Sequence, residues 1–116
     1  MPSKDPVVRF EDILENVARI EQYTSGMDAA AFASDIKTSD AVERCLARIS
    51  EAAVKLGDEA ESLCPDVSWR DIRGLGNRLR HEYTAVDTQR IWLMAEKDVQ
   101  PLKDACRAAL RKLENG

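Results

Sequence analysis

The chain has 116 residues, of which 44% are hydrophobic and 33% charged, and its formal net charge is −4. This length and apolar content suffice for one modest core, so we predict a single domain over residues 1–116. The acidic net charge argues against a protein that binds nucleic acid over its whole surface. No apolar run approaches the roughly 20 residues that span a bilayer, and the first residues lack a signal peptide's apolar core. We expect a cytoplasmic protein without a membrane partner.

The side chains that commonly hold metals or redox groups are scattered. Cys45, Cys64 and Cys106 are odd in number and lack the spacing of a zinc site or a Cys-x-x-Cys motif, so reduced thiols are expected, at least one packing as a small hydrophobic residue. Carboxylates are numerous but show no metal-binding arrangement, and no glycine-rich phosphate loop follows a strand. We therefore predict neither a metal nor a cofactor.

Helix-favouring residues dominate the composition, with only four prolines and five glycines. Apolar residues recur at steps of three and four from about Phe10 to Thr24, which predicts an amphipathic helix that Ser25-Gly26 ends. A short helical turn is expected from Asp28 to Asp35, anchored by Phe32.

A second long helix is indicated by the apolar stripe from Val42 to Leu56. Thr38 or Ser39 is its candidate N-cap, and Gly57 lies near its end. The stripe is the most regular in the chain, so this helix is expected to be central to the core.

The second half of the chain contains two further helical regions. Pro65 opens a loop that leads to a third helix from about Trp69 to His81, with Ser68 as its candidate N-cap. The last region runs from Thr88 toward Leu113, and Pro101 is expected to divide it into two helices. Because the pattern contains no strand and the connections are short, we predict an all-α, up-and-down bundle of four to five helices.

The third helix carries a concentration of positive charge. Between residues 70 and 80 the only acidic residue is Asp71, against four arginines: Arg70, Arg73, Arg78 and Arg80. This basic surface on an acidic body is a candidate RNA-binding site. A solvated helix face without a ligand is the alternative.

His81, the only histidine, lies on the polar side of this helix. On an ideal helix it falls with Arg70, Gly74 and Asn77, opposite the apolar stripe that begins at Trp69. An exposed histidine can act as a general acid or base. The alternative is that His81 is a solvent-exposed residue without a function. Gly74 and Gly76 inside the helix suggest the close approach of a backbone or ligand, the alternative being a tolerated weakness.

The run Trp69–Tyr83, followed by Val86-Asp87 and Ile91-Trp92, resembles the signature region of HepT-like proteins of the HEPN superfamily. In that family an Arg-Asn pair is followed by Leu and then by a His-x-Tyr element. The earlier segment Ile49–Ala53 resembles the family's Ile-Gly-Glu-Ala segment, and the order of helices agrees along nearly the whole chain.

The resemblance implies the toxin half of a bacterial toxin–antitoxin pair, a metal-independent endoribonuclease whose site is shared by the two subunits of a homodimer. Carried over by motif, His81 would be the general acid/base, Asn77 a supporting polar residue and Tyr83 the site that a nucleotidyltransferase antitoxin modifies with AMP. An arginine would stabilise the charge that builds on the phosphate.

This sequence departs from the family at that arginine, because Gly76 stands directly before Asn77. Arg78 and Arg73 are the candidate substitutes, and restoring the motif by Gly76→Arg is expected to raise any ribonuclease activity. A second interpretation is a catalytically degenerate helical module that dimerises and binds RNA, a nucleotide or a nucleotidyltransferase without cleaving.

Overall fold

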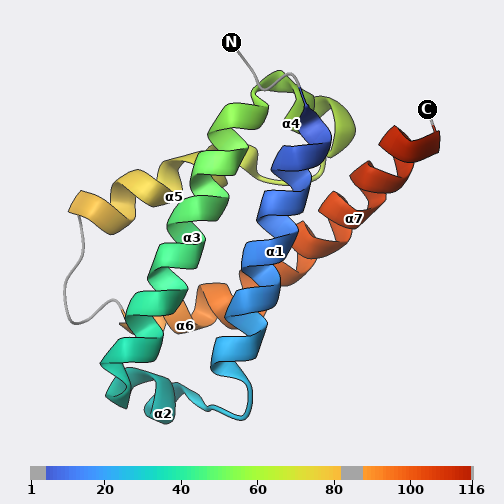
Figure 1. Cartoon of the computed structure of the whole chain (residues 1–116). Coiled ribbons are helices and arrows are strands. Elements are labelled where there is room, and N and C mark those ends of the chain that lie inside the picture. The colour runs from blue at the N-terminus through green and yellow to red at the C-terminus, as the bar shows by residue number, and fades with distance from the viewer. Residues whose placement is uncertain (1–4, 82–87, 116) are drawn as a thin grey trace.

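The structure, a computed structural model, describes residues 5–81 and 88–115, with the side chains of Arg80 and His81 outside the description. All regular elements in these ranges are helical, which confirms the predicted all-α class (Figure 1). The elements in chain order are α1 (Pro6–Thr24), α2 (Ala29–Ser34), α3 (Ile36–Leu56), α4 (Asp58–Leu63), α5 (Trp69–His81), α6 (Thr88–Leu93), η2 (Met94–Asp98) and α7 (Val99–Asn115).

Helix α1 begins four residues earlier than the apolar pattern predicted. The Asp5 side chain accepts a hydrogen bond from the Val7 backbone N–H at 3.1 Å, and Pro6 occupies the first helical position, where its missing N–H costs nothing. The apolar stripe is fully buried at Phe10, Ile13, Val17 and Ile20. The cap, rather than the first apolar residue, sets the start of the helix.

Two aspartates start the next helices. Asp28 caps α2 as predicted, whereas the N-cap of α3 is Asp35 and not Thr38 or Ser39. One Asp35 oxygen accepts the Thr38 backbone N–H at 3.0 Å, and the other accepts the Thr38 hydroxyl at 2.8 Å. Helix α3 ends at Gly57, whose φ of 57° is a left-handed conformation that favours glycine.

Helices α1 and α3 pack side by side at the centre of the fold, with α5 against α3 and α7 against α1 (Figure 1). The short helix α2 lies against α6, where the rings of Phe32 and Trp92 are 5.3 Å apart. The core takes fully buried side chains from most of these helices, among them Phe10, Val42, Ile49, Leu56, Trp69, Ile91 and Cys106. One apolar stripe per long helix therefore suffices to assemble the bundle.

The last helical region is divided just before Pro101, as the sequence predicted. Pro101 lies in the first turn of α7, and the widening of the helix comes just before it, in the π-helix η2. There the Val99 backbone N–H donates to the Met94 carbonyl, five residues back. Ile91, Ala95 and Val99 are all buried although they are four residues apart, a spacing that drifts about 40° per step on a regular α-helix. The π-helical turn absorbs this drift and keeps them on one face.

The ends of α1 and α7 are joined by polar contacts. Glu21 accepts hydrogen bonds from the Lys103 ammonium at 2.9 Å and from the Gln100 amide at 3.1 Å. These two bonds lower the pKa of Glu21 below its ordinary value of 4.5, so the carboxylate stays charged at neutral pH. The contact ties the start of α7 to α1 at the centre of the bundle.

The three cysteines are free, and all three are buried, where the sequence predicted that at least one packs as a small hydrophobic residue. Burial raises the pKa of Cys106 to about 12, so this thiol packs as a neutral hydrophobic group. Among the described residues no group of three potential ligands could hold a metal ion. No helix of the described ranges is long and apolar enough to cross a membrane.

Candidate active site

The motif helix α5 is fixed at its start by a buried tryptophan. Trp69 is 1% exposed, and its indole N–H donates to the Cys64 carbonyl at 2.9 Å. The Ser68 carbonyl accepts the backbone N–H groups of Asp71 and Ile72, which begins the helix. Because the Trp69 side chain is buried in the core, it fixes the direction in which α5 and its charged residues extend from the loop.

Ser50 of α3 joins the middle of α5 to the centre of the bundle. Its hydroxyl donates to the Arg73 carbonyl and accepts the Gly76 backbone N–H, both at 3.0 Å. Ser50 is 3% exposed, and Gly76 is buried as well. The sequence suggested a close approach at the helical glycines, and at Gly76 the group that approaches is the Ser50 side chain.

Arg73 is bound to the end of α3 rather than presented to solvent. Its guanidinium donates to the Ala53 carbonyl at 3.3 Å and the Gly57 carbonyl at 2.8 Å, and it forms two 2.7 Å bonds to the Glu61 carboxylate. The pair raises the pKa of Arg73 and lowers that of Glu61. Carbonyls at the end of a helix need such donors, so Arg73 acts as a C-terminal cap of α3.

The side of α5 away from α3 carries exposed polar residues. Arg70, Asn77 and Arg78 are exposed, and a Cβ built on Gly74 would have no atom within 4 Å. Arg78 donates to the Asp71 carbonyl at 3.2 Å, which lays its guanidinium along the helix surface. Of the predicted site residues, the structure thus leaves Arg70, Asn77 and Arg78 accessible on one helix and separates Arg73 from them.

Three other predicted residues lie at the limit of the description. His81 is the last residue of α5, and the side chains of His81 and Arg80 are outside the described part. Tyr83 belongs to residues 82–87, which are also outside it. The backbone places His81 one turn after Asn77 and three residues after Arg78.

An apolar cleft of about 490 Å³ lies next to the motif helix. Its walls are α5 on one side and η2 with the start of α7 on the other, and its floor is α3. The apolar lining comes mainly from Leu46, Ile49, Ile72, Leu75, Met94, Val99 and Leu102. Charged residues, including Arg78, Asp71 and Lys97, stand around these apolar side chains. Ile72 and Leu75 of α5 therefore line an open cleft.

The sequence alone did not identify two contributors to the geometry of α5, Ser50 and Glu61. Ser50 lies in the segment Ile49–Ala53, which resembles the family, but its two hydrogen bonds to α5 join residues 23 and 26 positions apart. Glu61 was one of many carboxylates on polar helix faces. No local signal distinguishes either residue from an ordinary exposed helix former.

Comparison with known proteins agrees with this architecture. The ribonuclease HepT-like family description matches residues 13–109, which include α3, α5 and the cleft. A Thermococcus cleftensis protein named "Probable ribonuclease HepT" is 33% identical over 94 residues, covering 81% of this chain and 86% of its own length. A Methanocaldococcus jannaschii protein named "Putative RNase" is 36% identical over 92 residues, covering 79% and 76%. No solved structure matches. The chain belongs to the HepT-like ribonuclease family.

Proposed function

We propose that this protein is a metal-independent endoribonuclease whose active site is built on α5 and completed across a homodimer. The observation that carries the proposal is the exposed face of α5, where Asn77 and Arg78 precede His81. RNA cleavage by the purified protein in the presence of a chelator is the test.

The chemistry assigned to these residues is acid–base transfer next to a phosphate. The His81 imidazole accepts the proton of a ribose 2′-hydroxyl and returns one to the leaving oxygen. Asn77 offers hydrogen bonds to the substrate, and Arg78 stabilises the charge that develops on the phosphate. Arg70 and Arg80 contribute to RNA binding from the same helix.

Arg78 and Arg73 are expected to respond differently to alanine substitution. Arg78→Ala should lower the cleavage rate at least about tenfold and change the stability of the folded chain little, because the hydrogen bond that is lost joins two exposed groups. Arg73→Ala should lower the free energy of unfolding by about 2 kcal/mol, because carbonyls at the end of α3 lose their donor. Initial cleavage rates and urea denaturation measure the two effects.

Each variant is the control of the other. An Arg73→Ala protein that unfolds like the wild type would refute the capping role. An Arg78→Ala protein that cleaves at the wild-type rate would remove Arg78 as the substitute for the missing motif arginine.

We infer further that a second copy of the chain occupies the apolar cleft. A chain of this length buries a limited core, and Ile72 and Leu75 gain apolar contacts only if another surface fills the space beside them. Charged residues of both signs around the lining suit a two-fold contact, in which Arg78 of one subunit can face an aspartate of the other. Dimerisation would also bring two copies of α5 together.

Met94→Glu is expected to convert the dimer to a monomer, because it places a charge in the apolar lining of the cleft. The neighbouring substitution Leu93→Glu is the matched control, since Leu93 is 47% exposed and does not line the cleft. Light scattering at high micromolar concentration measures the mass of each. A monomeric wild type, or a Met94→Glu dimer that retains its helix content, would contradict the proposal.

We also propose that the protein is the toxin of a toxin–antitoxin pair, with a nucleotidyltransferase as antitoxin and Tyr83 as the modified residue. An AMP group on Tyr83 would add bulk and negative charge two residues after His81 and exclude RNA. Incubation with a cognate nucleotidyltransferase and ATP should add one or more AMP masses, measured on the intact protein. An addition that persists in Tyr83→Phe would exclude this position.

A degenerate module that dimerises and binds RNA, a nucleotide or a nucleotidyltransferase without cleaving is the second candidate. Gly76 favours it, because the position of the motif arginine is buried against Ser50. A protein that binds RNA and cleaves none in the chelator assay would support this candidate over the first.

A further inference from the structure

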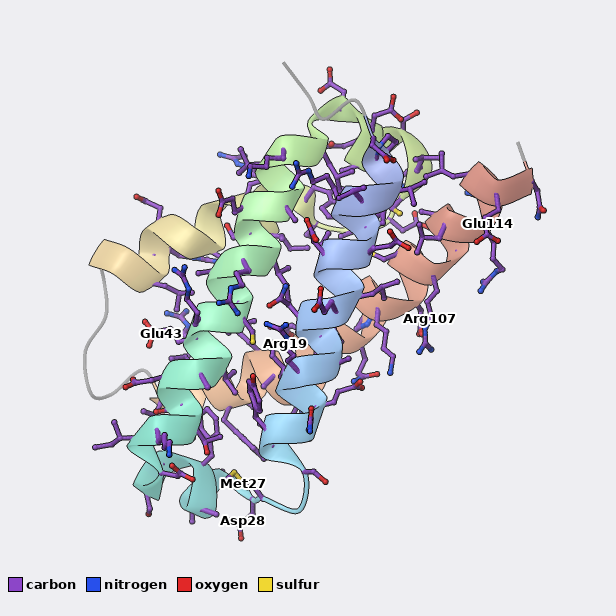
Figure 2. All side chains as sticks on the ribbon, in the orientation of Figure 1. Arg19, Met27, Asp28, Glu43, Arg107 and Glu114 are labelled. Carbon is purple, nitrogen blue, oxygen red and sulfur yellow. The ribbon has the colours of Figure 1, made fainter. Side chains whose placement is uncertain are left out.

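A second polar site lies away from α5, in a groove of about 260 Å³ between α1 and α3. Figure 2 shows Arg19 in the space between these two helices. Eight of the nine lining residues are polar or charged, and Ala52 is the exception. Four cations face three carboxylates, so the groove carries a small excess of positive charge. An apolar ligand therefore does not fit it.

The carboxylates of the groove are neutralised locally. Each forms an ion pair with a residue of its own helix, three or four positions away: Arg9 with Asp12, Arg19 with Glu15, and Lys55 with Glu51. Among the described residues Arg48 has no carboxylate partner. The excess positive charge of the groove thus belongs to Arg48.

Arg48 and Arg19 line the groove from its two walls, Arg48 on α3 and Arg19 on α1. Burial raises the pKa of the Cys45 thiol, and the positive charges of Arg48 and Arg19 lower it in part. Two arginines that line one groove from different helices form a suitable binding site for an oxyanion, because each offers several N–H donors in a fixed plane.

Asn16 makes the groove more selective than a simple anion site. It lines the groove and is 6% exposed, and its amide N–H donates to the Asp12 carbonyl at 2.8 Å. Its buried carbonyl oxygen Oδ1 accepts no hydrogen bond from any described residue. A buried acceptor without a donor is costly, so it favours a ligand that brings an O–H or N–H group.

We propose that the groove between α1 and α3 binds a protonated phosphate group, with its anionic oxygens on Arg48 and Arg19 and its P–OH donating to Asn16 Oδ1. Sulfate has the same shape but carries no proton at neutral pH, and an internal phosphodiester of RNA has none either. Inorganic phosphate is still largely a monoanion at pH 6, and the terminal phosphate of a nucleic acid chain, whose second pKa is about 6, keeps its proton in about half of the molecules. The site takes phosphate monoanions in preference to the RNA backbone.

This inference does not depend on the proposed ribonuclease activity, because none of its residues lies on α5. Isothermal titration of the purified wild-type protein at pH 6, in a phosphate-free buffer, gives the test. Its probes are inorganic phosphate, a 5′-phosphorylated dinucleotide, sulfate and dimethyl phosphate. Phosphate should bind at least about tenfold more tightly than sulfate or the diester, the difference expected from one hydrogen bond to a buried acceptor. Binding of the dinucleotide as well would identify chain ends as a source, and its absence would identify free phosphate.

Two variants and one control assign the residues. Arg48→Gln should lose phosphate binding at least about tenfold, whereas Arg44→Gln, an exposed arginine of α3 outside the groove, should retain it. Asn16→Leu should remove the preference for phosphate over sulfate, and its thermal denaturation reports whether it folds. Equal binding of sulfate and phosphate by the wild type, or unchanged phosphate binding by Arg48→Gln, would overturn the proposal.

Discussion

Replacing His81 with alanine is expected to reduce RNA cleavage by about 100-fold or more, since a positioned general acid/base contributes at least this factor. The rate is measured on a defined RNA with a chelator present, so that contaminating metal-dependent nucleases do not contribute. His81→Gln should be nearly as inactive, because glutamine retains hydrogen bonding but does not exchange a proton at neutral pH.

Arg44→Ala is the matched control, because it removes a positive charge from an exposed position of α3 outside α5. It should cleave at the wild-type rate. If His81→Ala also cleaved at that rate, the activity would not reside at the motif histidine. RNA binding without cleavage by the wild type would instead favour the degenerate module.

The second large effect concerns the position of the missing motif arginine. Gly76→Arg alone is expected to lower the free energy of unfolding by about 1–3 kcal/mol, because a long side chain is introduced at a buried position beside Ser50. The sequence alone predicted a gain of activity from this change. The structure adds a cost to that expectation, because Gly76 is buried and its backbone N–H donates to Ser50 of α3.

Ser50 and Gly76 are best changed together. The chain differs from the family pattern at both positions, with Ser50 in place of the glycine of the Ile-Gly-Glu-Ala segment and Gly76 in place of the motif arginine, and the two residues share a hydrogen bond. The double variant Ser50→Gly/Gly76→Arg should therefore be more stable than the two single variants predict, by about 0.5–3 kcal/mol. It should also be the variant with increased cleavage.

Urea denaturation of the wild type, the two single variants and the double variant completes a double-mutant cycle. RNA cleavage in the presence of a chelator is measured on the same four proteins. Additive free energies would show that the two positions are independent. A Gly76→Arg protein as stable as the wild type would mean that the arginine side chain fits at position 76 without the change at Ser50.

The helices could be predicted because their evidence is local. The apolar stripes of α1 and α3 and the loop at Pro65 each depend on residues within a few positions of one another. The N-cap of α3 was harder to predict, because Asp35, Thr38 and Ser39 are all favourable N-cap residues within about one turn. Only the observed hydrogen bonds identify Asp35 as the cap. Pro101 lies in the first turn of the second helix, as predicted, because its missing N–H costs nothing there.

The candidate site was predicted in composition but not in arrangement. Arg73 and Arg78 look alike in sequence, five residues apart on a basic helix. Their difference depends on the end of α3, because Arg73 reaches carbonyls 16 and 20 residues earlier in the chain. Ser50 is a similar case, since a buried serine between two helices can be recognised only when the second helix has been placed.

The π-helical turn at Met94–Asp98 has a consequence for how this chain tolerates changes in length. A π-helical turn has the form of one extra residue held within an α-helix, and here the buried faces of α6 and α7 remain aligned on either side of it. Loss of one residue from this turn could leave a regular helix, whereas the same deletion inside α3 would rotate every later side chain by about 100°. In the last helical region, a relative can therefore gain or lose one residue at this turn while the same side chains of the flanking helices stay buried.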